Sequence, residues 1–352
     1  MTSGRNTDHH SLIDATDFYG EYHGHKVSHL KKLLPVLRES SDRLIWLAGD
    51  SSLDNKYWFN QRKPAVGPYK DVLSPPWSIT DVNYWINQKL IERKSRTACI
   101  NTAVEATTLN ERTFGLRAQD KFLREHIQPN DVLVVSVGGN DVALMPCPCT
   151  IASILGLLFC VPQSWVYNGR TCSTCPLDDC CCGCGFSLAS CACARPPCLG
   201  YLRHLFGTRT QHYIRRLTAL NTPHTICVLM IYFPDEHVTP SWAGGALGAL
   251  GYNSNPTKLQ GLIRKAFLEA TSKIQIPGAQ VIPVPLFHVL DGRNPDDYVA
   301  RVEPSPIGGE KMAVYILDML ENSLQMHPGG DGEPCASSDF GSAPKPSYMS
   351  ER

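Results

Sequence analysis

The chain has 352 residues, with 33 Lys and Arg against 33 Asp and Glu, and 43% of its residues are hydrophobic. This length predicts one large domain or two smaller ones, and the zero net charge argues against a nucleic-acid or acidic-membrane binder, which needs basic residues in excess. Residues 1–24 are polar and lack the apolar core of a signal peptide. No apolar run reaches the roughly 18 residues of a membrane-spanning helix. We therefore expect a cytoplasmic protein without a transmembrane segment, in which residues 1–24 are flexible.

Apolar strands alternate with amphipathic helices along residues 25–326. Strands that alternate with helices indicate a central, mainly parallel sheet with helices on both faces, and therefore an α/β fold. In such folds the functional residues collect at the carboxyl ends of the strands. Strands are predicted over 43–48, 97–100, 131–137, 224–233 and 280–286, and helices over 25–38, 80–92, 114–127, 201–220, 256–274 and 309–324.

Two short motifs follow predicted strands. Gly49-Asp50-Ser51 places a serine hydroxyl on a tight turn before a probable helix, whose N-terminus favours developing negative charge. By itself this triplet is more typical of a helix cap. Gly138-Gly139-Asn140-Asp141 follows the strongest strand, where the Asn140 amide can donate a hydrogen bond to an oxyanion.

Together with residues 101–108, these motifs resemble three blocks of the SGNH (GDSL-type) hydrolase superfamily: G-D-S, N-x-G-x-x-G-x-T and G-x-N-D, in that order. The resemblance spans roughly residues 25–324, apart from a Cys-rich segment. It implies a three-layer α/β/α sandwich of the SGNH, flavodoxin-like type. It also implies hydrolysis of an ester, thioester or O-acyl group, with Ser51 as the nucleophile.

The family resemblance also implies an oxyanion hole. Asn140 and the backbone N–H groups of Ser51 and Ala106 would form it. Ala103 and Ala106 stand where the family has glycines. Ala106 keeps the N–H that the family's glycine donates, so the role can survive.

The sequence departs from the family at the fourth block. In the family this block reads D-x-x-H-P. Aligning Pro304 and Gly308 with this block puts Glu303 at the position of the family's histidine and Ala300 at that of its aspartate. A carboxylate with an ordinary pKa of about 4.3 is a poor base at neutral pH. Burial would raise that pKa.

Two histidines are further candidates for the base. His237 and His288 each follow a predicted strand, which places both at the expected catalytic edge of the sheet. Each is also typical of a surface loop. We favour a histidine over Glu303, because an imidazole pKa of about 6.5 suits neutral pH without burial.

Two function classes follow from these motifs. One is a carboxylic-ester hydrolase that needs no cofactor and acts on a small-molecule, lipid or glycan ester. The other is a catalytically inactive SGNH-like domain with a binding or scaffold role, which Glu303 at the histidine position keeps open.

Twelve of the 15 cysteines lie within residues 147–198, inside a predicted Cys-rich insertion over residues 145–200. A reducing compartment disfavours disulfides, and thiolates at short spacing suit zinc. Lipidation and free, packed thiols are the alternatives. Residues 327–352 are rich in Pro, Gly and Ser and predict a disordered tail. The candidate zinc ligands are Cys172, Cys175, Cys181 and Cys184.

Overall fold

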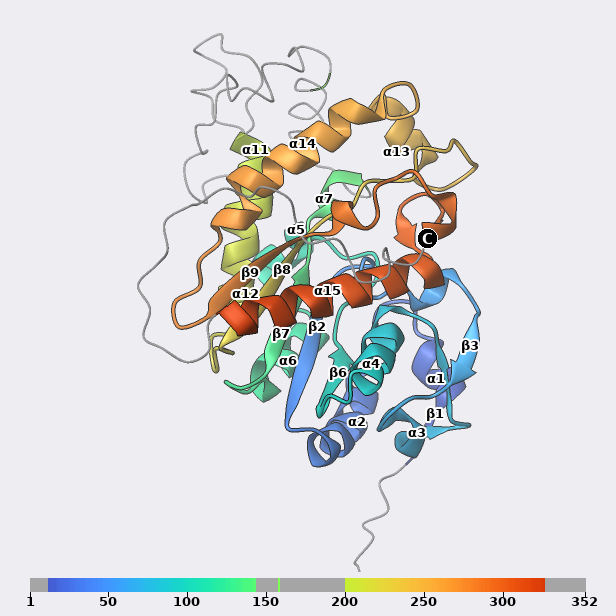
Figure 1. Cartoon of the computed structure of the whole chain (residues 1–352), viewed down its shortest axis with the longest axis vertical. Coiled ribbons are helices and arrows are strands. Elements are labelled where there is room, and N and C mark those ends of the chain that lie inside the picture. The colour runs from blue at the N-terminus through green and yellow to red at the C-terminus, as the bar shows by residue number, and fades with distance from the viewer. Residues whose placement is uncertain (1–11, 144–157, 159–199, 327–352) are drawn as a thin grey trace, which may run out of the picture.

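The computed structural model describes residues 12–143, 158 and 200–326, and a five-stranded sheet lies at its centre (Figure 1). Its strands are β2 (Arg43–Gly49), β6 (Thr97–Asn101), β7 (Val132–Ser136), β8 (Thr225–Met230) and β9 (Gln280–Pro285). Neighbouring strands all run parallel, in the spatial order β6-β2-β7-β8-β9. Numbered along the chain this order is 2-1-3-4-5, as in flavodoxin-like doubly wound folds. The predicted fold class is confirmed, and so are all five predicted strands.

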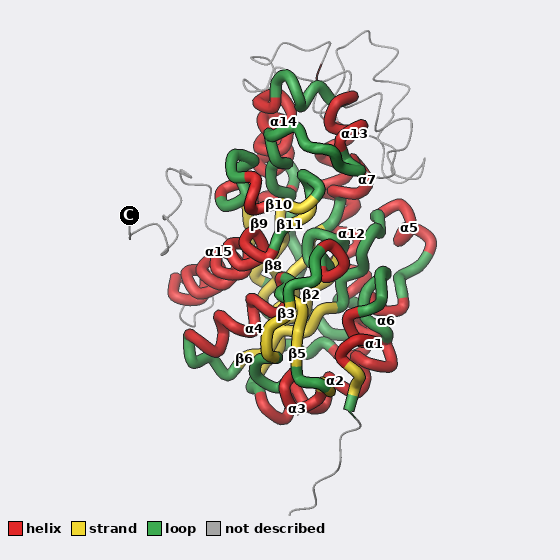
Figure 2. The backbone as a smooth tube through the Cα atoms, turned by 90° about the vertical axis from the view of Figure 1, so that its right-hand side faces the viewer, coloured by secondary structure: helices red, strands yellow, loops and turns green. Residues whose placement is uncertain are grey.

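Helices cover both faces of the sheet, which makes three layers. Figure 2 shows the sheet between α4 and α15 on one side and α6 and α12 on the other. The main helices are α2 (Val27–Ser40), α4 (Val82–Glu92), α6 (Ala118–His126), α12 (Thr210–Leu217), α14 (Pro256–Glu269) and α15 (Pro306–Met326).

The strands are apolar throughout because both of their faces are buried. In β2, Trp46 packs into the core on the side of α2, α6, α12 and α14, whereas Ile45 and Leu47 pack into the core beneath α4 and α15. Every residue of β7 and β8 is buried. Continuous apolar runs of this kind are typical of parallel strands covered on both sides.

Shorter elements complete the described part of the chain. Two of the small strand pairs are antiparallel, β3 with β5 and β10 with β11, and β1 runs parallel to β4. The short strands are β1 (Ile13–Asp14), β3 (Arg62–Pro64), β4 (Leu73–Ser74), β5 (Trp77–Ile79), β10 (Tyr298–Val299) and β11 (Glu303–Pro304). The short helices are α1 (Ala15–Tyr19), α3 (Tyr69–Val72), α5 (Leu109–Phe114), α7 (Gly139–Ala143), α11 (Gly200–Arg203), α13 (Gly244–Ala249), the 3₁₀ turns η1 (Lys56–Trp58), η4 (Thr271–Lys273), η5 (Leu286–His288) and η6 (Pro295–Asp297), and the π-helical η3 (His204–Arg209).

The prediction that residues 1–24 are flexible is wrong for residues 12–24. β1 pairs with β4, and the Phe18 ring is buried and stacks on His25 with a centroid distance of 3.9 Å. The apolar side chains here are too few and too closely spaced to form a recognisable period, so only their tertiary partners order them.

Two predicted helices are divided in the structure. The helix expected over 114–127 is the C-terminal end of α5 followed, after a break, by α6, and the helix expected over 201–220 is α11, η3 and α12 in succession. Apart from residues 158 and 200, the predicted Cys-rich insertion lies outside the described residues, as does the predicted tail. Within the described part, no helix is both long and apolar enough to span a bilayer.

Asp131 joins α2 and β2 to the start of β7. Both oxygens of its fully buried carboxylate accept hydrogen bonds from the guanidinium group of Arg38, at 2.6 and 2.5 Å. The Leu44 N–H and the Trp46 indole N–H each donate to it at 2.9 Å, and the Gln128 N–H at 2.8 Å. A buried carboxylate is tolerated only when donors replace its lost water, and here five do so.

We predict that Asp131→Ala lowers the free energy of unfolding by about 3–5 kcal/mol, because it leaves Arg38 unpaired and removes the acceptor of two strand groups. Urea denaturation measures the change. Asp42→Ala is the matched control, since Asp42 forms an exposed ion pair with Arg96, and its effect should stay below about 1 kcal/mol. Equal losses in the two variants would contradict the role of Asp131.

Candidate active site

Ser51 lies in the turn that follows β2, at the predicted carboxyl edge of the sheet. Gly49 has a φ of 136°, and a Cβ there would lie 1.8 Å from the Ser136 carbonyl oxygen at the end of β7. Only glycine lets the two strands approach so closely at this point. The Asp50 N–H donates to the same carbonyl at 3.1 Å. The close approach of β2 and β7 thus sets where the Ser51 hydroxyl lies.

Glu303 is the side chain that the Ser51 hydroxyl contacts. Ser51 Oγ donates to Glu303 Oε1 at 3.3 Å, across 252 positions of sequence. Glu303 is 2% exposed, and its Oε2 atom has no hydrogen-bond partner among the described residues. Burial raises the pKa of Glu303 to about 8; the Ser51 hydrogen bond lowers it, and the carboxylates of Asp50 and Asp54 raise it further. The carboxyl therefore holds a proton below this pH and is ionised above it.

A tight hairpin positions Glu303 beside Ser51. β10 and β11 pair antiparallel, and the turn between them contains Ala300 and Arg301 with φ values of 49° and 70°. The buried Arg301 guanidinium donates to the Asp235 carbonyl at 3.0 and 3.2 Å, which holds the turn against the loop after β8. Ala300, aligned with the family's aspartate, lies in this turn and brings no carboxylate to the site.

Within the described residues, neither histidine candidate hydrogen-bonds to Ser51. His288 is an exposed residue whose Nδ1 lies 3.1 Å from the Tyr315 hydroxyl of α15, and partial desolvation of the ring lowers its pKa. The His237 side chain is 55% exposed, with its Nδ1 2.9 Å from Asp235 Oδ1. Among the described residues the Ser51 hydroxyl bonds instead to Glu303. Sequence alignment gave the position of Glu303, but only the fold shows its burial.

Asn140 and Ala106 are held in one loop cluster beside Ser51. Asn140 lies in α7, and its Nδ2 donates to the Thr107 carbonyl at 3.0 Å. An amide nitrogen carries two hydrogens, so a second donor remains for a ligand. Ala106 has a φ of 55°, in the left-handed region that favours glycine, which explains why the family has glycine there. Asn140 lines the same cavity as Ser51.

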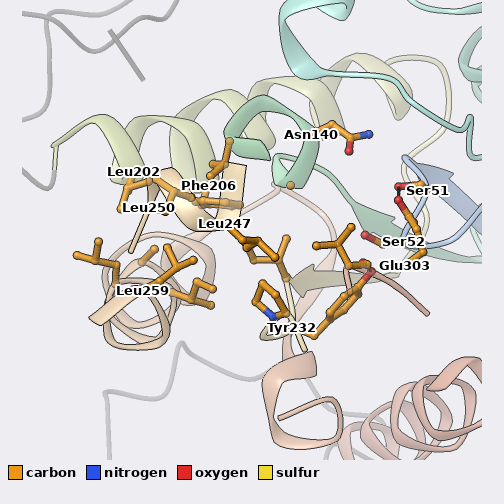
Figure 3. A pocket seen from close by; sticks show the side chains of 18 of the residues that line it. Ser51, Ser52, Asn140, Leu202, Phe206, Tyr232, Leu247, Leu250, Leu259 and Glu303 are labelled. Atoms are coloured by element: carbon orange, nitrogen blue, oxygen red, sulfur yellow. Dashed lines mark hydrogen bonds between the residues drawn. The ribbon is translucent and has the colours of Figure 1, made fainter. Parts of the chain in front are cut away.

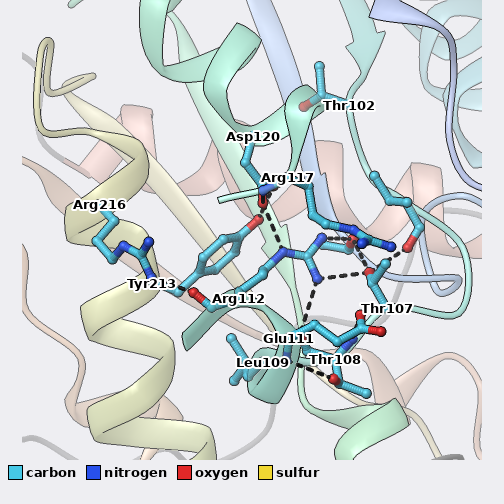
Figure 4. A network of polar contacts seen from close by, with 12 residues as sticks. Thr102, Thr107, Thr108, Leu109, Glu111, Arg112, Arg117, Asp120, Tyr213 and Arg216 are labelled. Carbon is cyan, nitrogen blue, oxygen red and sulfur yellow. Dashed lines mark hydrogen bonds and ion pairs between the residues drawn. The ribbon is translucent and has the colours of Figure 1, made fainter. Parts of the chain in front are cut away.

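Arg112 connects the loop that follows β2 with the loop that follows β6 (Figure 4). Its buried guanidinium donates to the Gly49 carbonyl at 2.9 Å and to Thr107 Oγ1 at 2.8 Å. Its Nε donates to Asp120 at 3.0 Å, and the Tyr213 hydroxyl donates to the same carboxylate at 2.7 Å. No sequence signal marks Arg112, because a single arginine on a short helix carries no motif.

A second buried carboxyl, Glu105, lies near Glu303. Burial raises the pKa of Glu105 to about 9, and the neighbouring carboxyls of Glu303 and Asp54 raise it further. The Trp58 indole donates to Glu105 Oε1 at 3.2 Å. Asp54 forms a fully buried ion pair with Lys56 at 2.5 Å, which neutralises part of this acidic cluster. No sequence signal marks these residues, because acidic side chains acquire such raised pKa values only through burial.

No group of three or more His, Cys, Asp or Glu residues that could hold a metal ion occurs in the described ranges. The four candidate zinc ligands, Cys172, Cys175, Cys181 and Cys184, lie outside those ranges. Zinc binding there stays a prediction.

A cavity that opens to solvent lies beside Ser51 (Figure 3); its space, including the solvent at its mouth, is about 860 Å³. Polar groups gather at one end of it, where Ser51, Ser52, Asn140 and Glu303 lie. The rest of the wall is apolar and comes mainly from α11, η3, α13 and α14. A serine–carboxyl pair and an amide donor therefore face the same cavity.

No protein-family model matches the chain, and no curated protein matches it in sequence. Similar solved structures include a lipase/acylhydrolase from Enterococcus faecalis, with 12% identity, a TM-score of 0.38 and coverage of 80% of this chain and 96% of that one. An acetylxylan esterase from Geobacillus stearothermophilus has 12% identity, a TM-score of 0.39 and coverage of 80% and 95%. A lipase from a goat rumen metagenome has 14% identity, a TM-score of 0.38 and coverage of 79% and 97%. In fold the chain resembles the SGNH (GDSL-type) hydrolases, and this resemblance rests on its strand order and on the motifs at the carboxyl edge of its sheet.

We predict that Arg112→Met lowers the free energy of unfolding by about 3–5 kcal/mol, because it leaves the carboxylate of Asp120 buried without its charged partner. It should also reduce labelling of Ser51 by a fluorophosphonate probe, since the loops of Gly49 and Thr107 lose their shared donor. Urea denaturation and probe labelling measure the two effects. The control is Arg96→Met, because the Arg96 side chain is 77% exposed. Unchanged labelling in a destabilised Arg112→Met would show that Arg112 acts on stability alone.

Proposed function

We propose that the chain is an SGNH-type carboxylic-ester hydrolase that cleaves an ester, thioester or O-acyl bond with Ser51 as nucleophile and Glu303 as general base. The observation that carries the proposal is the hydrogen bond from the Ser51 hydroxyl to the buried Glu303 carboxyl. This bond lies at the carboxyl edge of a doubly wound sheet, where such folds bind their ligands.

The reaction follows from this geometry in two halves. Ionised Glu303 accepts the proton of Ser51 Oγ as the oxygen attacks the acyl carbon. The resulting oxyanion accepts hydrogen bonds from Asn140 Nδ2 and from the N–H groups of Ser51 and Ala106. Glu303 then passes its proton to the departing alcohol or thiol, which leaves an acyl-enzyme. In the second half Glu303 takes a proton from water, the hydroxide attacks the acyl group, and Ser51 regains its proton.

Burial makes a carboxylate a usable base here. A glutamate with an ordinary pKa accepts a serine proton poorly, whereas the raised pKa of Glu303, about 8, brings its basicity close to that of an imidazole. The consequence is that the enzyme works best at alkaline pH. Enzymes tune other catalytic carboxyls by the same means.

A catalytically inactive binding domain is the alternative, since Glu303 replaces the family's histidine and Ala300 its aspartate. We favour the hydrolase because Glu303 contacts the nucleophile and both line one cavity with Asn140. A small-molecule, lipid or glycan ester is the substrate class that this proposal includes.

The nucleophile is tested by substitution. Ser51→Ala should lower kcat/KM for short p-nitrophenyl esters by at least about 10⁴-fold and abolish fluorophosphonate labelling, because no other group replaces the attacking oxygen. Asn140→Ala should lower kcat by about 10²–10³-fold, the usual loss for one oxyanion donor. Ser254→Ala, which changes an exposed serine, is the control and should keep full activity. Activity in Ser51→Ala equal to that of the wild type would rule out the mechanism.

The base is tested by the pH profile. Only ionised Glu303 accepts a proton, so kcat/KM should rise with pH and reach half its maximum near pH 8. Glu303→Gln should be inactive at every pH, whereas His237→Ala and His288→Ala should keep the wild-type profile. A rise of kcat/KM with pH that disappears in His237→Ala or His288→Ala would instead identify that histidine as the base.

The pH dependence of stability gives a second measurement of the Glu303 pKa. The folded pKa of Glu303 lies above its ordinary value of 4.5, so folding binds a proton in this interval. The stability it contributes is complete below about pH 4.5 and is lost as pH rises through about 8. Glu303→Gln should therefore unfold with a smaller loss of stability between pH 5 and pH 9 than the wild type, whether or not the chain is an enzyme.

A further inference from the structure

The apolar end of the cavity has a regular wall formed by one face of α14. Leu259, Leu262, Ile263 and Ala266 all line it, at spacings of three and four residues, and therefore lie on one side of the helix. The seven residue-to-residue steps from Leu259 to Ala266 correspond to about 10 Å along the helix axis. The wall is thus an extended apolar stripe.

Two other helical segments enclose this stripe. Leu202 of α11 and Phe206 of η3 belong to one continuous helical segment that lines the cavity. Leu247 belongs to the second segment, α13. Figure 3 shows these side chains grouped with Leu259 at the end of the cavity opposite Ser51 and Glu303. No charged side chain lines this end among the described residues. A ligand there must be apolar, since a polar one would lose its hydrogen bonds to water without replacement.

The apolar wall is continuous with the catalytic loops. The Phe206 ring approaches Gly138, the first residue of the Asn140 motif, so closely that a Cβ there would lie 2.8 Å from the ring. Val302, next to Glu303 in the chain, lines the same cavity. A ligand whose reactive carbonyl lies at Ser51 therefore has its apolar part directed into the space between α13, α14 and η3.

We propose that this cavity binds the acyl chain of the substrate and that the preferred ester carries a medium-length saturated acyl group rather than an acetyl group. The inference rests on the proposed hydrolase function and specifies its substrate. Carbon–carbon bonds of about 1.5 Å that meet at about 111° advance about 1.25 Å per carbon. The stripe of about 10 Å therefore matches a chain of about eight carbons.

The test is a series of p-nitrophenyl esters from acetate to dodecanoate, assayed with the full chain near pH 8. Each methylene buried in the cavity is expected to raise kcat/KM by up to about fourfold. We expect an increase of at least roughly 100-fold from acetate to octanoate and no further increase beyond about decanoate, because the wall ends there. A profile that is flat, or that favours acetate, would overturn this inference and leave the hydrolase proposal standing.

Two tryptophan substitutions on α14 form a matched pair. Leu259→Trp fills the end of the cavity far from Ser51, so the ratio of kcat/KM for octanoate to that for acetate should fall by about tenfold or more. Leu268→Trp makes the same chemical change at a position that is 50% exposed and outside the cavity, and should keep the wild-type ratio. An equal ratio in the two variants would overturn the assignment of the cavity.

Binding separates failure of the inference from failure of the hydrolase proposal. Dodecanoate should bind to Ser51→Ala, and the change in tryptophan fluorescence, to which Trp242 at the cavity wall contributes, measures it. If the wild type hydrolyses no ester but dodecanoate binds to Ser51→Ala, the hydrolase proposal alone is overturned. Absence of both hydrolysis and binding would overturn both.

Discussion

The close approach of β2 and β7 at Gly49 and Ser136 is the constraint on which the site depends. Because a Cβ at Gly49 would lie 1.8 Å from the Ser136 carbonyl, the backbone of the nucleophile turn is set by direct contact between two strand ends. Arg112 then binds the Gly49 carbonyl and the Thr107 hydroxyl together. Asn140, following β7, donates to the Thr107 carbonyl. Three loops that begin on different strands are thereby held as one rigid unit around Ser51.

The buried carboxyl that we propose as the base also limits stability. Glu303 and Glu105 are both nearly fully buried, and each has one oxygen without a hydrogen-bond partner among the described residues. Burial raises the pKa of both groups, and the Asp54–Lys56 ion pair compensates only Asp54. A base of this kind therefore requires a stable surrounding fold. The five donors at Asp131, far from this cluster in the sequence, are part of that stability.

The proposed substrate occupies both ends of the cavity. Ser51 and Glu303 face its polar end, and the stripe on α14 forms its apolar end. Phe206 belongs to both, since it lines the apolar end and packs against Gly138 of the oxyanion loop.

The sequence by itself determined the five strands, the doubly wound class and the positions of Ser51 and Asn140, because apolar runs and glycine-containing turns are local signals. It also aligned Glu303 with the family's histidine, but it favoured His237 or His288 as the base. Only the tertiary structure shows that the Ser51 hydroxyl contacts Glu303, because a contact between residues 252 positions apart and the burial that raises a pKa have no local signature. For the same reason Arg112, Glu105 and the apolar stripe of α14 acquired their roles only when helices and strands distant in the sequence packed together.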